Sequence, residues 1–373
     1  MRRTRLLPLL TLSALGAGAL PACEEKPESA PTQAAAPVAA PTAAKPPASK
    51  PMTPEQLAHF FLPLPPPKDA KPAPEDTEAQ VALGRMLYFE PRLSKNHDVS
   101  CNTCHGLTTF GVDNKPLSDG HKGQKGSRNS PTVYNAAGHI AQFWDGRAAT
   151  LEEQAQGPIL NPVEMAMPDE KRVVATLSSI PEYTARFREA FPGDKKPVTL
   201  ANAARAIAAY ERKLTTPSRF DKYLAGQHGA LTEQEQRGLQ LFATTGCTTC
   251  HNGPAVGGTS FQKLGLVEDY PGLKDAGRFD ATKNEDDRGK FRVPTLLNVD
   301  KTGPYLHDGS VQDLPTMVRL MAKHQLARNL TDAEVDDLVA FLKSLTGELP
   351  PQELISAPPL PPSTKKTPRP DPT

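Results

Sequence analysis

The sequence lacks the features that mark several large protein classes. Its 43 Lys and Arg residues are balanced by 42 Asp and Glu residues, so it has no positive excess of the kind that nucleic-acid binding uses. No segment shows the sustained apolar–polar alternation of β-strands. The apolar run at residues 6–20 is too short for an ordinary membrane-spanning helix. We therefore expect a mainly α protein with little β structure and no nucleic-acid partner.

Cysteine is also scarce, and four of the five cysteines fall into two Cys-x-x-Cys-His motifs, at residues 101–105 and 247–251. This motif is the attachment signature of c-type haem. Each thiol adds to one vinyl group of the same porphyrin, and the adjacent imidazole becomes the proximal iron ligand. A single copy could instead belong to a zinc or redox site, but two copies predict a dihaem protein. The predicted attachment and proximal residues are Cys101, Cys104 and His105, and Cys247, Cys250 and His251.

The remaining cysteine, Cys23, ends a segment that reads as an export signal. Residues 1–23 have a basic start and an apolar run, and they close on Leu-Pro-Ala-Cys, which resembles a bacterial lipoprotein box. In such proteins the cysteine is lipidated and becomes the N-terminus, which tethers the chain to a membrane. The alternative is an ordinary secretory signal with an incidental cysteine. Both readings predict a periplasmic protein, and Glu24 favours the outer membrane as the site of a lipid anchor.

Composition divides the rest of the chain into four parts. Residues 24–74 form a Pro/Ala-rich tether, in which residues 24 to about 51 are predicted to be disordered and extended and residues 52–74 are a more apolar, proline-broken lead-in. Residues 75–220 and 227–348 each contain one haem motif preceded by an amphipathic helix, which predicts two cytochrome c-like domains joined by loop-rich segments. Residues 349–373 form a Pro-rich tail that we expect to be extended.

For the first iron, the residues alone leave the sixth ligand open. His121 lies between glycines in a pliable loop, which suits a ligand that must leave, but a solvated loop histidine fits equally well. His97 and His139 are competitors that we interpret as surface or core residues.

For the second iron there are four candidates for the sixth ligand. Met317 and Met321 lie one helical turn apart on one face, so their spacing does not separate them. His307 and His324 are the others. A methionine in a helix also commonly fills a gap in a core.

Several blocks in the same order resemble the bacterial dihaem cytochrome c peroxidases, across residues 75–348. These are the first haem motif, Arg-Asn-Ser-Pro-Thr at 128–132, Gln-Phe-Trp-Asp-Gly-Arg at 142–147 and Pro-Tyr-Leu-His-Asp-Gly at 304–309. One departure is Leu297, which stands where many relatives have an arginine.

The resemblance implies roles for the iron ligands. His121 would bind the resting first iron and depart on activation, and Met321 would bind the second iron, with Met317 in the core. His307 would lie near a haem propionate. His/Met ligation raises a haem potential relative to bis-histidine ligation, so the second haem would receive the electrons.

The resemblance also implies catalytic and calcium-binding residues. Glu164 would move the proton in peroxide cleavage, Gln154 would donate a hydrogen bond in the same pocket, and Trp144 would carry electrons between the haems. A calcium ion would bind Asn129 and the backbone carbonyls of Thr302 and Pro304, which are hard oxygen ligands.

The function so implied is reduction of hydrogen peroxide to water in the periplasm, with electrons from a small c-type cytochrome or a cupredoxin. The family is often dimeric, so a homodimer is possible. One alternative is an electron carrier without peroxidase activity. Another is the dihaem relative that matures a quinone cofactor, which uses a tyrosine ligand where this sequence offers Met321.

Overall fold

The computed structural model describes residues 52–64 and 76–373. These residues are mainly helical, with one short antiparallel sheet, β1 (Phe261–Lys263) and β2 (Lys290–Arg292), in which Phe261 lies opposite Arg292. The predicted fold class is confirmed. Two apolar cores organise the described chain, one around each haem motif, and we call the corresponding regions the N-terminal lobe (76–216) and the C-terminal lobe (217–348).

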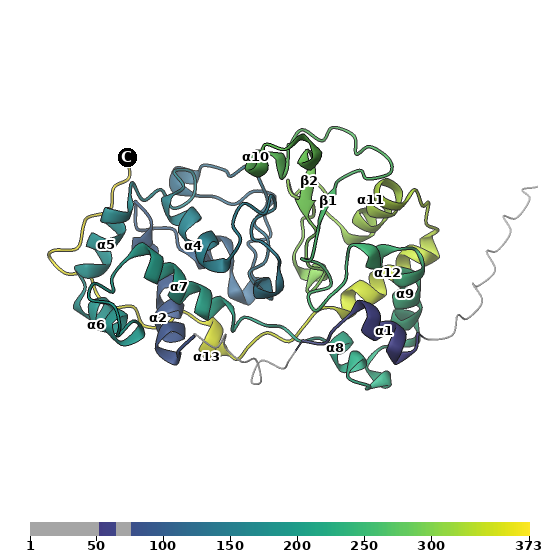
Figure 1. Ribbon diagram of the computed structural model, residues 1–373, viewed down its shortest axis with the longest axis horizontal. Helices are drawn as coiled ribbons and strands as arrows, with labels where there is room; N and C mark the ends of the chain where they lie inside the picture. The colour runs from purple at the N-terminus through teal and green to yellow at the C-terminus, as the bar shows by residue number, and fades with distance from the viewer. Residues whose placement is uncertain (1–51, 65–75) are drawn as a thin grey trace, which may run out of the picture. The chain divides into compact units, whose positions relative to one another are not determined.

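The N-terminal lobe is built on the crossing of α2 and α7 (Figure 1). Gly84 of α2 makes this crossing possible, because a Cβ there would lie 1.8 Å from the carbonyl oxygen of Ala206. A Thr77 capping box starts α2, and Pro181 is the first residue of a separate helix, α6. The helices of this lobe are α2 (Glu78–Tyr88), α3 (Cys101–Cys104), α4 (Leu151–Leu160), α5 (Glu170–Ser178), α6 (Pro181–Ala190) and α7 (Leu200–Glu211).

The C-terminal lobe repeats this arrangement with α9 and α12. Gly238 of α9 allows the same close crossing, since a Cβ there would lie 2.0 Å from the carbonyl oxygen of Asp337. Capping boxes at Thr232 and Thr331 start α9 and α12. The helices of this lobe are α8 (Arg219–Leu224), α9 (Glu233–Thr244), α10 (Phe279–Thr282), α11 (Leu314–Leu326) and α12 (Asp332–Ser344).

Residues 52–64 pack on the C-terminal lobe, although they precede the N-terminal lobe in sequence. They contain α1 (Pro54–Phe60), which begins with a capping box at Thr53. Leu57 and Phe61 are buried in the C-terminal core, and the Leu64 amide donates to Asp221 Oδ1 at 2.6 Å. This apolar, proline-broken lead-in therefore differs from a free chain, because a few apolar residues between its prolines join the C-terminal core.

The Pro-rich tail also differs from a free extended segment, because it returns to the N-terminal lobe (Figure 1, yellow). Its helix α13 (Gln352–Ile355) buries Ile355 in the N-terminal core. Tyr210 Oη donates to the Leu354 carbonyl at 2.7 Å, and the Asp371 amide donates to the Lys95 carbonyl at 2.9 Å. Hydrogen bonds to the lobe thus extend almost to the end of the tail.

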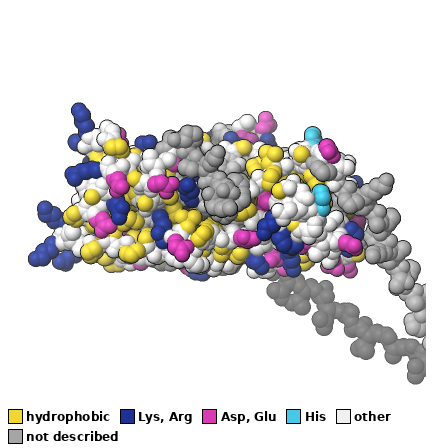
Figure 2. All heavy atoms as spheres, turned by 90° about the horizontal axis from the view of Figure 1, so that it is seen from below, with side chains coloured by type: hydrophobic (Ala, Val, Ile, Leu, Met, Phe, Trp, Pro, Cys, Tyr) yellow, Lys and Arg dark blue, Asp and Glu magenta, His cyan; other side chains and the backbone are white. Residues whose placement is uncertain are grey.

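On the face shown in Figure 2, acidic and basic side chains are mixed with apolar ones over most of the surface. Such mixing fits the near-zero net charge of +1. Among the described helices, none has the length and hydropathy needed to cross a membrane. Cys23 and the predicted signal lie outside the described residues.

Candidate haem centres

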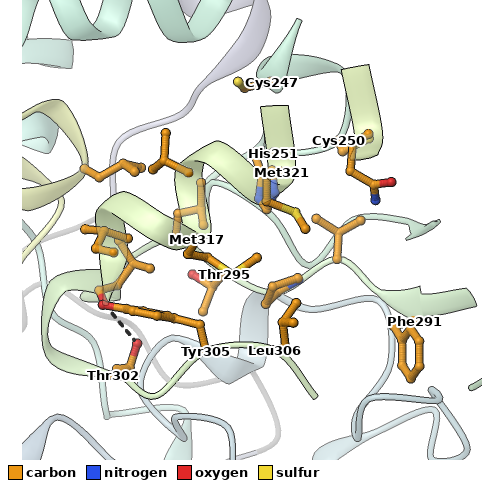
Figure 3. Close-up of a pocket in the computed structure, with 18 of the residues that line it drawn as sticks. Cys247, Cys250, His251, Phe291, Thr295, Thr302, Tyr305, Leu306, Met317 and Met321 are labelled. Atoms are coloured by element: carbon orange, nitrogen blue, oxygen red, sulfur yellow. Dashed lines mark hydrogen bonds between the residues drawn. The ribbon is translucent and has the colours of Figure 1, made fainter. Parts of the chain in front are cut away.

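In the C-terminal lobe, the second haem motif forms one wall of a large, mainly apolar cavity (Figure 3). Cys247 begins a 3₁₀ turn directly after α9, where Gly246 adopts a left-handed conformation with φ of 100°. Cys250 and His251 follow on the same wall. Burial lowers the pKa of His251 to about 4, which keeps the imidazole neutral, as an iron ligand must be. The backbone of Pro294 faces this ring and opposes the shift.

Helix α11 brings the predicted methionines to the same cavity (Figure 3). Asp313 caps the helix by accepting a hydrogen bond from the Thr316 amide at 2.8 Å. Met317 and Met321 both line the cavity, so the structure does not choose between them. His324 does not line it, and its Nδ1 lies 3.1 Å from the Glu268 carbonyl oxygen. A thioether and an imidazole can therefore approach one cofactor from different elements, which fits a c-type haem.

The first haem motif begins with α3, and the Nδ1 atom of its half-buried histidine is inaccessible to solvent. Burial lowers the pKa of His105, and the backbone of Pro131 faces the ring as Pro294 faces His251. Tyr88 Oη donates to the His105 carbonyl at 2.7 Å and fixes the segment against α2.

His121 is also buried, at 5% exposure, and both of its ring nitrogens lack hydrogen-bond partners in the described protein. Buried polar atoms are nearly always satisfied, so this imidazole is suited to a partner that the protein does not supply. An iron atom would be such a partner, and the residues fit a second c-type haem.

The loop of His121 lies directly against the segment that carries Glu164. The His121 amide donates to the Glu164 carbonyl at 2.7 Å. A Cβ at Gly120 would lie 2.0 Å from the Val163 carbonyl oxygen, so only glycine allows this approach. The structure thus brings together the predicted displaceable ligand and the predicted acid–base residue, which are 43 positions apart in the numbering.

The Glu164 side chain is half-buried. Burial raises its pKa, while the Arg147 charge and a hydrogen bond from Asn161 oppose the rise. Asn161 Nδ2 donates to Glu164 Oε1 at 2.8 Å. Gln154 lies on α4, one turn after the Thr150 cap, and is partly exposed. A carboxyl group with a raised pKa is suited to accept and return a proton.

Trp144 lies where the two lobes meet. Its Nε1 donates to the Asn129 carbonyl at 2.8 Å, and its backbone carbonyl accepts from the Arg292 amide in β2 at 2.8 Å. Its ring lines the C-terminal cavity and faces the edge of His307, with centroids 6.4 Å apart. His307 in turn stacks on Phe291 at 4.3 Å. The tryptophan predicted to link the haems therefore contacts both lobes.

The three residues of the predicted calcium site also meet at this junction. Asn129, Thr302 and Pro304 all line the cavity, and Asn129 Nδ2 donates to the Lys115 carbonyl at 2.9 Å, which leaves its Oδ1 for a cation. Among the described residues, no group of three His, Cys, Asp or Glu side chains could hold a metal. A calcium ion would depend on amide and carbonyl oxygens, with water completing its shell.

Two residues that line the C-terminal cavity belong to none of the motifs recognised in the sequence. His139, interpreted there as a surface or core residue, lines the cavity together with Arg292. Neither could be found from a local motif, because His139 comes from the other lobe. Leu297, where many relatives have arginine, is buried in the C-terminal core.

Known proteins match the chain over most of its length. The family described as "Di-haem cytochrome c peroxidase" matches residues 78–229, and the family "Cytochrome c" matches residues 235–346. The cytochrome c551 peroxidase of Nitrosomonas europaea is 49% identical over 300 residues, which cover 79% of this chain and 87% of that protein. The chain belongs to the di-haem cytochrome c peroxidase family.

Two further relatives show the extent of the likeness. The cytochrome c551 peroxidase of Pseudomonas aeruginosa is 48% identical and is matched over 85% of this chain and 92% of its own length. Among solved structures, a MauG-like protein associated with microbial copper homeostasis has a TM-score of 0.67 at 31% identity. The match covers 80% of this chain and 96% of that one.

Proposed function

We propose that this cytochrome-c peroxidase reduces hydrogen peroxide to water with electrons from a small c-type cytochrome or a cupredoxin. The observation that carries the proposal is the unequal surroundings of the two haem motifs. One is paired with methionines on a regular helix. The other lies in a lobe that places a buried histidine in a loop, and the backbone of this histidine is hydrogen-bonded to the half-buried Glu164. Relatives at 45–49% identity are named cytochrome c peroxidases, which supports the same chemistry here.

When bound, the two c-type haems supply electron transfer in the C-terminal lobe and peroxide reduction in the N-terminal lobe. His251 and Met321 would hold the C-terminal iron, and His105 and His121 would hold the N-terminal iron at rest. Because α11 is a continuous helix packed against α12, Met321 is held in place. His121 lies in a short 3₁₀ turn and not in a long helix, so we expect the N-terminal lobe to be the one whose ligand leaves.

Release of His121 requires its amide to leave the Glu164 carbonyl, a bond of 2.7 Å. The left-handed conformations of Lys122 and Gly123 give the loop a short turn that can rearrange without moving a helix. Once the loop has moved, Glu164 would accept the proton from one peroxide oxygen and return it to the other. The oxygen that receives the proton would leave as water. Gln154 orients the peroxide by a hydrogen bond, and Trp144 provides the route for electrons between the lobes.

Calcium binding by Asn129, Thr302 and Pro304 would hold the two lobes in the arrangement that Trp144 needs. Because two ligands come from the C-terminal lobe and one from the N-terminal lobe, the ion would couple the lobes. We further propose that the protein acts in the periplasm, tethered to a membrane through lipidated Cys23. Cell fractionation tests this: a Cys23→Ala protein that stays with the membranes contradicts the anchor.

The function is tested by assaying peroxide turnover with reduced small cytochrome c on the half-reduced, calcium-loaded holoprotein. Steady turnover is expected, and its absence in a protein that carries both haems would favour the electron-carrier alternative. His121→Gly should make the N-terminal haem high-spin before any reduction. His228→Gly removes an exposed histidine and serves as the control. An unchanged oxidised spectrum in His121→Gly contradicts the gating role of His121.

A further inference from the structure

Arg292 in β2 is a buried cation that the described protein does not neutralise. It is 3% exposed, it forms no ion pair among the described residues, and its Nη1 has no hydrogen-bond partner. Its Nε makes one long contact, 3.4 Å, with the Phe143 carbonyl oxygen. Burial lowers its pKa to about 10. Removing a guanidinium from water costs several kcal/mol unless an anion compensates it, so the position implies an anionic partner.

The cavity that Arg292 lines belongs to the second haem motif. Its described lining includes Cys247, Cys250 and His251, and none of its lining residues is an aspartate or glutamate. Arg292 is the one lining residue with a permanent charge. The anion must therefore come from what the cavity binds. A c-type haem carries two propionate carboxylates on the edge opposite its thioether bonds.

His139 lies beside Arg292, although it belongs to the N-terminal lobe. Both of its ring nitrogens are buried without partners, and the Arg292 charge contributes to lowering its pKa. Two hydrogen bonds hold it there: the Ile140 amide donates to the Gly258 carbonyl at 2.9 Å, and the Gly258 amide donates to the Val293 carbonyl at 2.8 Å. A Cβ at Gly258 would lie 2.3 Å from His139 Cδ2, so glycine also makes room for the ring.

We propose that Arg292 and His139 together receive the propionate carboxylates of the haem attached to Cys247 and Cys250, so that the N-terminal lobe completes the pocket of the C-terminal haem. The guanidinium offers paired donors that match a carboxylate, and a neutral imidazole offers one more.

The proposal has a consequence for the haem potential. Oxidation adds a positive charge to the haem, and a nearby guanidinium disfavours it. Loss of Arg292 also leaves the propionate charge uncompensated, which acts in the same direction. The midpoint potential of the C-terminal haem should therefore fall in Arg292→Met and stay close to wild type in Arg292→Lys.

The experiment measures that potential by spectroelectrochemistry and the propionate bending mode by resonance Raman, both on purified holoprotein. Arg288→Met is the matched control, since Arg288 lies in the same region but is exposed and paired with Glu285. Arg292→Met should lower the potential and shift the mode, and Arg288→Met should change neither. Unchanged values in Arg292→Met, or an equal change in the control, overturn the proposal.

If Arg292→Met does not retain haem, the proposed propionate contact is tested with His139→Phe. It should lower the potential and shift the propionate mode, whereas His139→Gln, which keeps a donor, should change them less. Wild-type values in His139→Phe overturn the role of His139. These readouts require the C-terminal haem but neither peroxide turnover nor ligation by Met321, so they remain informative if the proposed function fails.

Discussion

The two lobes are built on one plan and differ at the place where it matters for chemistry. In each, a glycine lets the first helix cross the last, and a proline backbone faces the proximal histidine. In each, an asparagine in a left-handed conformation follows that proline by four residues. Both asparagines, Asn135 and Asn298, donate to Thr216 Oγ1, at 2.9 and 2.8 Å. Thr216 thus joins the two halves where one lobe ends and the other begins.

The difference lies in the helix that follows the Asp-Gly turn of each lobe. Helix α4 begins after Thr150 and α11 begins after Asp313, so Gln154 corresponds to Met317. By the same count, the position of Met321 is occupied in the N-terminal lobe by Pro158, which has no ligand atom. That lobe instead offers His121 from a loop. In the ligation proposed above, the helix would hold its ligand in place and the loop could release its ligand. The difference at one helical position would then separate the two tasks.

The largest expected effect is on peroxide turnover, the activity that we assign to the N-terminal lobe. Glu164→Gln removes the proton acceptor from the N-terminal lobe and should reduce peroxide turnover by about 100- to 10,000-fold. The C-terminal haem spectrum should not change. Glu153→Gln, an exposed position on α4, is the control in a steady-state assay. Turnover within a few-fold of wild type in Glu164→Gln would assign the proton transfer to another group.

The shared scaffold is tested by adding one methyl group to each lobe. Gly84→Ala and Gly238→Ala place a Cβ about as close to a helix carbonyl in either lobe, so each should cost about 3 kcal/mol of unfolding free energy. Chemical denaturation of the holoprotein measures the loss. Gly193→Ala is the control, because Gly193 is exposed with no neighbour near its Cβ position. Very different costs at the two glycines would show that the crossings are not equivalent.

The junction between the lobes is tested by Thr216→Val. The change keeps the shape but leaves two buried amide donors without their acceptor, and it should cost about 2 kcal/mol of unfolding free energy. Thr215→Val is a closely matched control, since the Thr215 hydroxyl is buried without a partner and its removal should cost nothing. If both variants unfold alike, the hydroxyl of Thr216 does not join the lobes.

The smallest effect concerns a residue that differs between the equivalent helices. Gly84 contacts Ala206 of α7, and Gly238 contacts Asp337 of α12. Counted from these two contacts, Glu211 corresponds to Leu342, and both residues are 5% exposed. Burial raises the pKa of Glu211 to about 8. The folded state then holds a proton that the unfolded chain releases, so wild-type stability falls as pH rises from about 4.5 to about 8.

Glu211→Gln should remove this pH dependence. Relative to wild type, its free energy of unfolding should be higher at pH 8 than at pH 4 by about 1 kcal/mol or more. Denaturation curves at the two pH values measure it, and Glu189→Gln at an exposed position controls for the loss of charge. An equal pH profile in wild type and Glu211→Gln would mean that the carboxyl group is ionised in the folded protein.

Much of the fold follows from local signals in the sequence. Capping boxes at Thr232 and Thr331 start two helices and Pro181 starts a third. Such helix starts can be recognised from the sequence because capping depends on residues three positions apart. The haem motifs are equally local. The packing of residues 52–64 and of the tail could not be predicted in this way, since Phe61 and Ile355 are isolated apolar residues whose partners lie far away in sequence.

The site shows the same limit. The association of His121 with Glu164 depends on a backbone hydrogen bond and on a glycine at position 120, neither of which forms a recognisable spacing. His139 is interpreted from the sequence as a surface or core residue. Its place beside the cavity of the other lobe depends on the close approach of Gly258, which is distant in sequence. Met321 remains a prediction, because Met317 lines the same cavity.

The tail has a consequence for the order of folding. Ile355 and the hydrogen bonds to Leu354 complete the N-terminal core, yet these residues are synthesised after the whole C-terminal lobe. The first lobe to emerge therefore cannot close its own core until the second has been made. Both Cys-x-x-Cys-His segments thus become available to the attachment machinery before the first lobe is sealed, and contacts of such long sequence separation make that last step slow.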